Sequence, residues 1–184
     1  MKNKEVIKII LSILKNNISE ISNSGNIFSF SKSDISISIS KIKYYYIINF
    51  SVRNKNNNWD KINYTLNFLD KSYYILTHIL KKQKNINNEI VKNLFKLDLT
   101  LVDINWYDDG NCRLGDYNLE KNAYYKTISI FYKTKVIKCT NISNRKLNYI
   151  FLKIKKIFNE RKNKELFDNI PSTYKRNDKI KKIL

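Results

Sequence analysis

Apolar residues near the N-terminus repeat with the period of an α-helix. They are Val6, Ile7, Ile10, Leu11, Leu14, Ile18 and Ile21. Steps of three and four residues place such a set on one stripe of a helix. We expect an amphipathic helix from about residue 3 to residue 20, packed on a sheet and ended near Gly25.

The period then changes to two. Ile35, Ile37 and Ile39 alternate with serines, and the same alternation runs through residues 43–53 and 62–68. Alternate residues of a strand point to the same side of a sheet. The loop 54–60 between the last two segments is rich in Asn, which tolerates the positive φ of tight connections. This pattern predicts an antiparallel meander with one buried face.

A helical series follows the meander, and it overlaps the last strand. Residues from Ile62 to Leu80 also fit spacings of four and three, so we divide the two elements at Asp70. The Asp70 side chain can accept from the free N–H groups of a first helical turn. We predict one helix from Asp70 to Leu80, followed by Lys81, Lys82 and Lys84, and a second from Asn88 to Lys96.

The second half of the chain shows further strands and a strong helix. The apolar parity changes between Leu101 and Val102, which predicts a long bulged strand over 97–106, followed by a turn at 108–111. We expect strands at 124–133 and 136–140, and a helix capped by Ser143. The apolar stripe of that helix consists of Leu147, Ile150, Phe151, Ile154, Ile157 and Phe158.

The order of these elements predicts an α+β fold. Antiparallel strand meanders would be packed by amphipathic N-terminal and C-terminal helices, in a single domain over 1–168 with a basic tail over 169–184. Similar fragments, residues 45–50 and 125–131, would suit a degenerate two-fold internal repeat. Coincidence in a chain dominated by few residue types is the alternative.

Charge is distributed unevenly along the chain. The formal net charge is +19, yet residues 97–120 hold one Arg against six acidic residues, and residues 121–184 hold 18 Lys or Arg against four. Lys, Asn and Ile dominate the composition, as codons of an AT-rich genome would give, so the asymmetry is more informative than the total. The positive electrostatic field of such a chain favours polyanionic partners.

Signatures of catalysis and of cofactor binding are missing from the sequence. His78 is the single histidine, Cys112 and Cys139 are far apart, and the three glycines form no phosphate-binding loop. We therefore predict a non-enzymatic protein without a cofactor or a metal-ligand set. The apolar stretch 9–14 is too short to cross a bilayer, so we expect no membrane partner. We predict a reducing, cytoplasmic location, which would be the host cytoplasm if the protein is viral.

The acidic segment allows three interpretations. Its residues are Asp103, Asp108, Asp109, Asp116 and Glu120. Several carboxylates could hold Mg²⁺ or Ca²⁺ for a nuclease, but the spacing matches no calcium loop. The cluster could also be a solvated turn. The third interpretation is docking on a basic protein, or on the basic face of this one.

The basic residues lead to the functional hypothesis. We predict that the protein binds nucleic acid, RNA in the first place, or a ribonucleoprotein, by a Lys-rich C-terminal helix and tail and by one sheet face where Tyr45 and Tyr125 interleave with cations. The predicted contacts are Lys43, Tyr45, Arg53, Lys133, Lys146, Lys153, Lys155, Lys156, Lys175, Arg176, Lys179, Lys181 and Lys182. Lys contacts phosphate as a point charge and reads little sequence. The alternative is an inhibitor or adaptor from a phage, virus or mobile element that docks on a nucleic-acid-handling enzyme such as a CRISPR-type defence nuclease.

Overall fold

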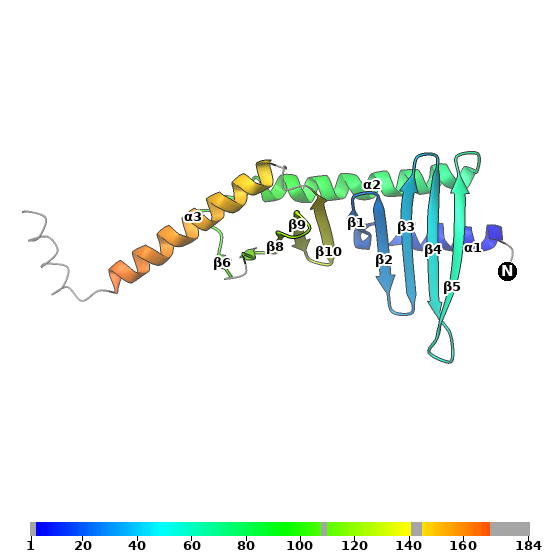
Figure 1. Ribbon diagram of the computed structural model, residues 1–184, viewed down its shortest axis with the longest axis horizontal. Coiled ribbons are helices and arrows are strands. Elements are labelled where there is room, and N and C mark those ends of the chain that lie inside the picture. The colour runs from blue at the N-terminus through cyan, green and yellow to red at the C-terminus, as the bar shows by residue number, and fades with distance from the viewer. Residues whose placement is uncertain (1–2, 108–109, 141–144, 170–184) are drawn as a thin grey trace, which may run out of the picture.

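The computed structural model describes residues 3–107, 110–140 and 145–169, and it has an α+β fold as the sequence predicts (Figure 1). The first half contains α1 (Asn3–Asn16), the 3-10 helix η1 (Ile18–Glu20), β1 (Ser22–Ser24), β2 (Ile27–Lys32), β3 (Ile35–Ile42), β4 (Tyr45–Arg53), β5 (Trp59–Asn67) and α2 (Lys71–Leu94). The second half contains β6 (Ile104–Trp106), β7 (Cys112–Leu114), β8 (Tyr117–Asn122), β9 (Thr127–Tyr132), β10 (Lys135–Thr140) and α3 (Arg145–Asp168).

The ten strands of the described residues form one sheet in the order β5-β4-β3-β2-β1-β10-β9-β8-β7-β6. Each half is an antiparallel meander, as the alternating pattern predicts for β3 to β5. The halves join where β1 lies parallel to β10, with Asn23 opposite Ile137. A common order of strands in the two halves does not by itself establish an internal repeat, which stays a prediction.

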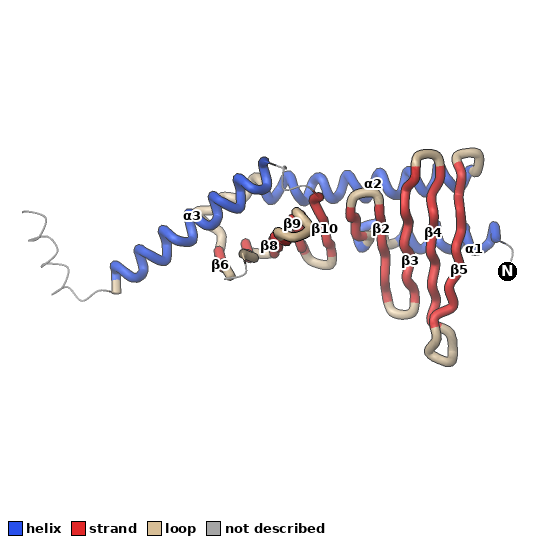
Figure 2. Tube along the Cα trace, in the orientation of Figure 1, coloured by secondary structure: helices blue, strands red, loops and turns tan. Residues whose placement is uncertain are grey.

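Helix α2 links the two halves behind the sheet (Figure 2). Its N-terminal part contributes Leu76 and Ile79 to a core formed with α1 and β2 to β5. Its C-terminal part contributes Ile90 and Leu94 to a second core, formed with β6 to β10 and α3. Because α2 has 24 residues, it extends for about 36 Å at the usual helical rise of 1.5 Å per residue. That length lets one helix serve both cores.

Strand alternation sets which residues fill each core. In the first half Phe28, Ile37 and Ile48 point toward α1 and α2, and each is at most 1% exposed. In the second half Leu119 and Ile130 point toward α3 and are fully buried. Removal of such a side chain costs about 2–5 kcal/mol, so each core is a major source of stability.

Several strands were not predicted from the sequence because they are joined by tight hairpin turns. Five of the described hairpins have two-residue connections whose first residue has positive φ, the geometry that matches the twist of paired strands. These first residues are Gly25, Ser33, Lys43, Gly115 and Lys133. Three of the five are not glycine, so the usual turn signal is weak. Strands β2, β7 and β8 lie beside these turns and were not predicted. Gly25 ends no helix but forms the β1–β2 turn.

Two further predictions were wrong. The expected helices 70–80 and 88–96 are one helix, α2, which Asp70 does cap by accepting from the Ser72 N–H at 2.7 Å. The sequence predicted a break between them because the polar residues Gln83 and Asn87 interrupt the apolar stripe, although both are buried in the continuous helix. The expected strand 97–106 is reduced to β6, since the Asp98 carboxylate accepts from the Thr100 N–H and hydroxyl and turns the chain. The predicted cap Ser143 lies outside the described residues.

Candidate nucleic-acid interface

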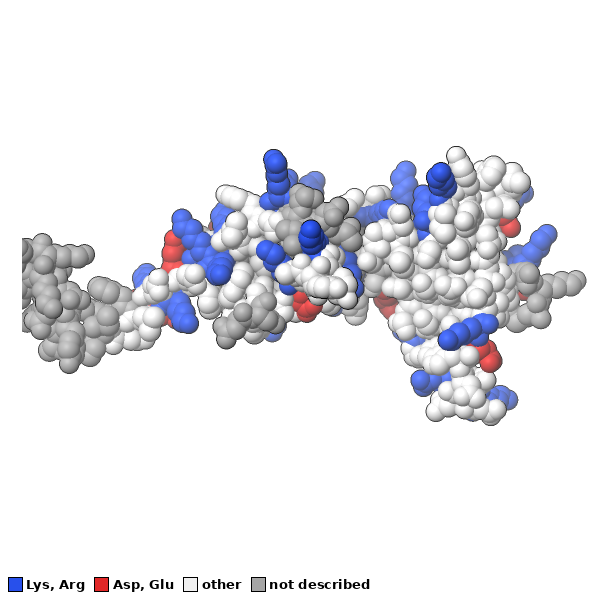
Figure 3. All heavy atoms as spheres, in the orientation of Figure 1, with Lys and Arg blue, Asp and Glu red and all other residues white. Residues whose placement is uncertain are grey.

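The helices pack on one face of the sheet and leave the other face open in the described part of the chain. In Figure 1 the strands of the first half lie in front of α1 and α2. The alternate residues of β2 and β3 that point to this outer face are mostly serines, namely Ser29, Ser31, Ser36, Ser38 and Ser40. Over β2 to β5 this face is largely free of charge at its centre (Figure 3).

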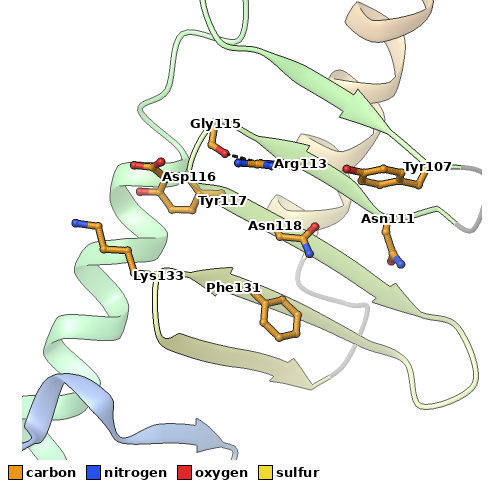
Figure 4. A pocket seen from close by; sticks show the side chains of 9 residues that line it. All are labelled: Tyr107, Asn111, Arg113, Gly115, Asp116, Tyr117, Asn118, Phe131 and Lys133. Atoms are coloured by element: carbon orange, nitrogen blue, oxygen red, sulfur yellow. Dashed lines mark hydrogen bonds between the residues drawn. The ribbon is translucent and has the colours of Figure 1, made fainter.

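The outer face of the second half is hollowed. One hollow of about 530 Å³ is lined by Tyr107, Asn111, Arg113, Gly115, Asp116, Tyr117, Asn118, Phe131 and Lys133 (Figure 4). A second of about 590 Å³ is lined by Ser24, Asn111, Glu120, Lys121, Asn122, Tyr125, Thr127, Ser129, Phe131 and Lys138. Asn111 and Phe131 line both hollows, so the two adjoin. We call them together the β7–β10 trough.

Phe131 is the aromatic ring at the middle of the trough. It lies on β9 between Asn118 of β8 and Val136 of β10, which are its cross-strand partners. Its neighbours along the strand, Ile130 and Tyr132, point into the core. Strand alternation therefore forces an apolar ring onto the open side of the sheet. The ring is half-buried and borders both hollows (Figure 4).

The lining of the trough contains more cations than acids. Arg113, Lys121, Lys133 and Lys138 line the trough, against Asp116 and Glu120. The Arg113 Nε donates to the Gly115 carbonyl oxygen at 3.2 Å, which holds the guanidinium along the end of β7. Lys133 stands at the β9–β10 turn, with its Nζ 5.5 Å from the Tyr132 ring centroid. The trough thus has cations in both hollows that Phe131 borders.

Tyr117 borders the first hollow but points to the helix side of the sheet, where it is buried in the second core. Its ring is stacked at a tilt on Tyr132, with 4.7 Å between the centroids. Burial is the main cause that raises the pKa of Tyr117, and the nearby Tyr132 and Asp116 raise it further. The phenol therefore stays neutral at physiological pH and can donate a hydrogen bond.

The described acidic residues of the segment take separate positions around β6 to β8. Asp116 lies in the β7–β8 turn and Glu120 on β8, each in a different hollow of the trough. Asp103 precedes β6, and its backbone carbonyl accepts from the Gly115 N–H. Asp108 and Asp109 lie outside the described residues. In the described ranges no group of three or more His, Cys, Asp or Glu side chains is placed to hold a metal ion.

The cations predicted on the sheet are spread over the first half. Lys43 lies in the β3–β4 turn, Tyr45 at the start of β4 and Arg53 at its end. Eight residues of strand separate Tyr45 from Arg53, which is about 26 Å at the usual rise. The Arg53 guanidinium stacks on Trp59 at 5.2 Å and lies 3.9 Å from an Asp34 carboxylate oxygen. Of the described residues predicted to contact nucleic acid, Lys133 and Tyr125 line the trough.

The lysines of α3 occupy three sides of the helix. Successive residues turn by about 100°, so Lys146 and Lys153 lie on one border of the buried stripe, Lys155 on the other and Lys156 opposite. Lys146 lies over Phe95 and Lys155 over Trp106, at 5.5 and 5.8 Å from the ring centroids. Lys156 pairs with Glu160 at 3.8 Å. Figure 3 likewise shows Lys and Arg side chains spread along the visible face. The predicted Lys175, Arg176, Lys179, Lys181 and Lys182 lie outside the described residues.

Most trough residues were missed by sequence reasoning. Arg113, Asn118 and Lys138 lie on strands β7, β8 and β10, and the first two of these strands were not predicted. A usable signal was present, because Leu114, Tyr117 and Leu119 keep the buried parity across the two-residue turn. That parity puts Arg113 and Asn118 on the outer face.

Comparisons with known proteins found no match. No protein-family model, no curated protein and no solved structure matches the chain. None of the described helices combines the length and the apolar character needed to cross a bilayer.

Proposed function

We propose that the β7–β10 trough binds single-stranded nucleic acid, RNA in the first place. The observation that supports this proposal is the position of Phe131, a half-buried ring on the outer sheet face that borders both hollows, one lined by Arg113 and Lys133 and the other by Lys121 and Lys138. Single-strand binders use the same combination, in which bases stack on aromatic rings and cations follow the phosphates.

The shape of the trough favours a single strand over a duplex. Each hollow is of the size that takes a small planar group, and Phe131 is reached from both. Bases stacked inside a duplex cannot reach such a ring, whereas those of a single strand can. Lys predominates over Arg among the cations, so we expect phosphate contacts without strong sequence preference.

Fluorescence anisotropy with a labelled twelve-nucleotide oligouridine tests the proposal. We expect Phe131→Leu to weaken binding by about fivefold or more, since a stacked base contributes roughly 1–3 kcal/mol. Arg113→Glu with Lys133→Glu should weaken it further. The matched control is Lys81→Glu with Lys82→Glu, on the exposed side of α2, which changes the net charge equally. Equal losses in the two double variants would show a non-specific charge effect and refute the proposal.

Dependence on salt provides a second criterion. Neutralisation of three phosphates predicts a slope of about −2 in a plot of log affinity against log salt for a single strand. A duplex of the same length should bind more weakly at every salt concentration. Tighter binding of the duplex, or a slope near zero, would contradict the proposed mode.

A further inference from the structure

The outer edge of β5 is unpaired. β5 is the last strand of the sheet on this side, it has nine residues, and no described segment pairs with its outer edge. Proteins usually protect such an edge with charges, Pro or a bulge, because it can template another strand. From Ile62 to Asn67 β5 contains no charged residue and no Pro. The stretch 62–67 of this edge is therefore without these protecting features.

The ladder shows which backbone groups of β5 point outward. Phe68 donates its N–H to the Tyr44 carbonyl at 3.2 Å, just beyond the ends of the β4–β5 ladder. In an antiparallel pair, bonded and non-bonded positions alternate. The even-numbered residues of β5 therefore bond to β4. Lys61, Asn63 and Thr65 direct both their N–H and C=O groups away from the sheet.

A hollow of about 590 Å³ lies beside the same stretch of β5. It is bounded by α1, by β5 and by the start of α2, and its lining is Lys4, Ile7, Lys8, Tyr64, Thr65, Leu66, Leu69, Asp70, Lys71 and Ser72. In Figure 1 the N-terminal end of α1 lies behind and beside β5.

The chemistry of this hollow is apolar at its base and positive at its rim. Ile7 and Leu66 are buried, and Leu69 is 78% exposed. Three lysines face a single acid, Asp70, which already accepts from the Ser72 N–H. A partner that lies here would therefore gain by carrying apolar and acidic side chains.

We propose that the outer edge of β5 accepts an extended acidic segment of a partner protein as an eleventh strand. The segment would pair with the outward N–H and C=O groups of Asn63 and Thr65, and side chains would enter the hollow toward Lys4, Lys8 and Lys71. Strand addition of this kind takes affinity from the main chain and specificity from side-chain pockets. This surface is separate from the trough, and the inference does not depend on the proposed function.

Two other occupants fit less well. A second copy of the chain carries the same three lysines and the same +19 charge, so pairing two β5 edges would bring like charges together. A nucleic-acid backbone offers phosphate oxygens to the lysines, but its donors and acceptors do not alternate at the spacing of the N–H and C=O groups of a β-strand edge. An acidic peptide satisfies the donors, the acceptors and the charge.

The experiment uses the full chain and a capped nine-residue peptide in which Glu and Val alternate. We expect the peptide to slow amide hydrogen exchange at Lys61, Asn63 and Thr65 by about tenfold at saturation, because these N–H groups become bonded. Asn63→Pro removes one outward donor but no bond to β4, and it should weaken peptide binding by about fivefold. An amide spectrum unchanged outside β5 would show that this variant is folded.

Charge reversal tests the acidic preference. Lys4→Glu with Lys8→Glu and Lys71→Glu should abolish binding, while the control Lys81→Glu with Lys82→Glu and Lys92→Glu should retain it. A peptide of alternating Lys and Val should not bind. Arg113→Glu with Lys133→Glu should leave peptide binding unchanged, which separates this site from the trough.

Four outcomes would overturn the inference. These are unchanged exchange at the three amides, equal binding by the two triple variants, equal protection by the oligouridine, and protection that rises with protein concentration alone. The last result would identify a second copy as the occupant.

Discussion

The Lys135 Nζ lies 3.2 Å from the Asn87 Oδ1 in the interior of the molecule, where both residues are 5% exposed. Asn87 and the fully buried Gln83 occupy the part of α2 between the two cores, and the Gln83 Nε2 donates to the Ile21 carbonyl at 2.9 Å. A buried ammonium with polar neighbours thus marks the junction of the two halves. Buried charges of this kind cost stability unless they are hydrogen-bonded.

Asn87→Ala should therefore destabilise the protein by about 2–3 kcal/mol, because it leaves the Lys135 ammonium without this acceptor. Lys135→Met combined with Asn87→Leu should recover most of the loss, since a packed apolar pair can replace a buried polar one. Urea denaturation measures both values. The control is Asn88→Ala at the exposed neighbouring position. If Asn87→Ala costs no more than this control, the hydrogen bond does not contribute to stability.

The same lysine predicts a pH dependence. Burial lowers the pKa of Lys135 below 10.5, the value expected in the unfolded chain. At a pH between the lowered pKa of the native state and 10.5, Lys135 is protonated in the unfolded chain but not in the native protein. The stability of the native protein therefore rises with pH in that window. Below the window both states are charged and the full cost of burial is present. We expect the stability of Lys135→Met relative to wild type to fall as pH approaches about 10.5.

Denaturation at several alkaline pH values, with Lys92→Met as the exposed control, checks this expectation. The free energy of unfolding of Lys92→Met relative to wild type should stay constant over this pH range. If the free energy of unfolding of Lys135→Met relative to wild type is equally constant, burial leaves the proton affinity of Lys135 unchanged.

Arg161 connects α3 to the loop before β6. Its Nη1 donates to the Val102 carbonyl at 2.9 Å, and its Nη2 donates to those of Leu99 and Thr100 at 2.8 and 2.6 Å. Lys cannot reproduce this fork. We expect Arg161→Lys to cost about 1–2 kcal/mol and to speed amide exchange over residues 97–103. Arg145→Lys, at an exposed position of the same helix, is the control. Unaltered exchange in the loop would argue against this role.

The two thiols should differ in reactivity. Burial raises the pKa of Cys112 to about 12, and it also raises that of the half-buried Cys139. At pH 8 the thiolate fraction of Cys112 is then about one in ten thousand. We expect a disulfide reagent to modify Cys139 first and Cys112 only as the protein unfolds. The rate of reaction with the reagent is measured for Cys112→Ala, which retains Cys139, and for Cys139→Ala, which retains Cys112. Equal rates would contradict the prediction.

Much of the fold could be predicted where the pattern is local. The Ile–Ser alternation of β3 and the amphipathic stripes of α1 and α3 follow from residues close in sequence, and the structure confirms these elements. Helix α2 was divided because Gln83 and Asn87 are polar yet buried. Only the packing of two separate cores on one helix gives these residues an interior position.

The trough was harder to predict, because its members come from separate strands. Arg113, Phe131 and Lys138 meet through cross-strand pairing of β7 to β10. Short strands of three residues carry too little periodicity to be recognised, and turns such as that at Lys133 lack glycine. Charge counted along the chain gave no indication of this grouping. The predicted nucleic-acid residues of α3 and of the C-terminal tail stay a prediction.

The sequence by itself determined the class of fold, the buried faces of the longer strands and the excess of positive charge, because each depends on composition or on neighbours one turn or one strand apart. Tertiary structure alone decided that β1 lies beside β10, that α2 serves both cores, and that Phe131 shares a hollow with Arg113 and Lys133. Register between distant strands depends on how whole faces pack together, and no local pattern contains that information.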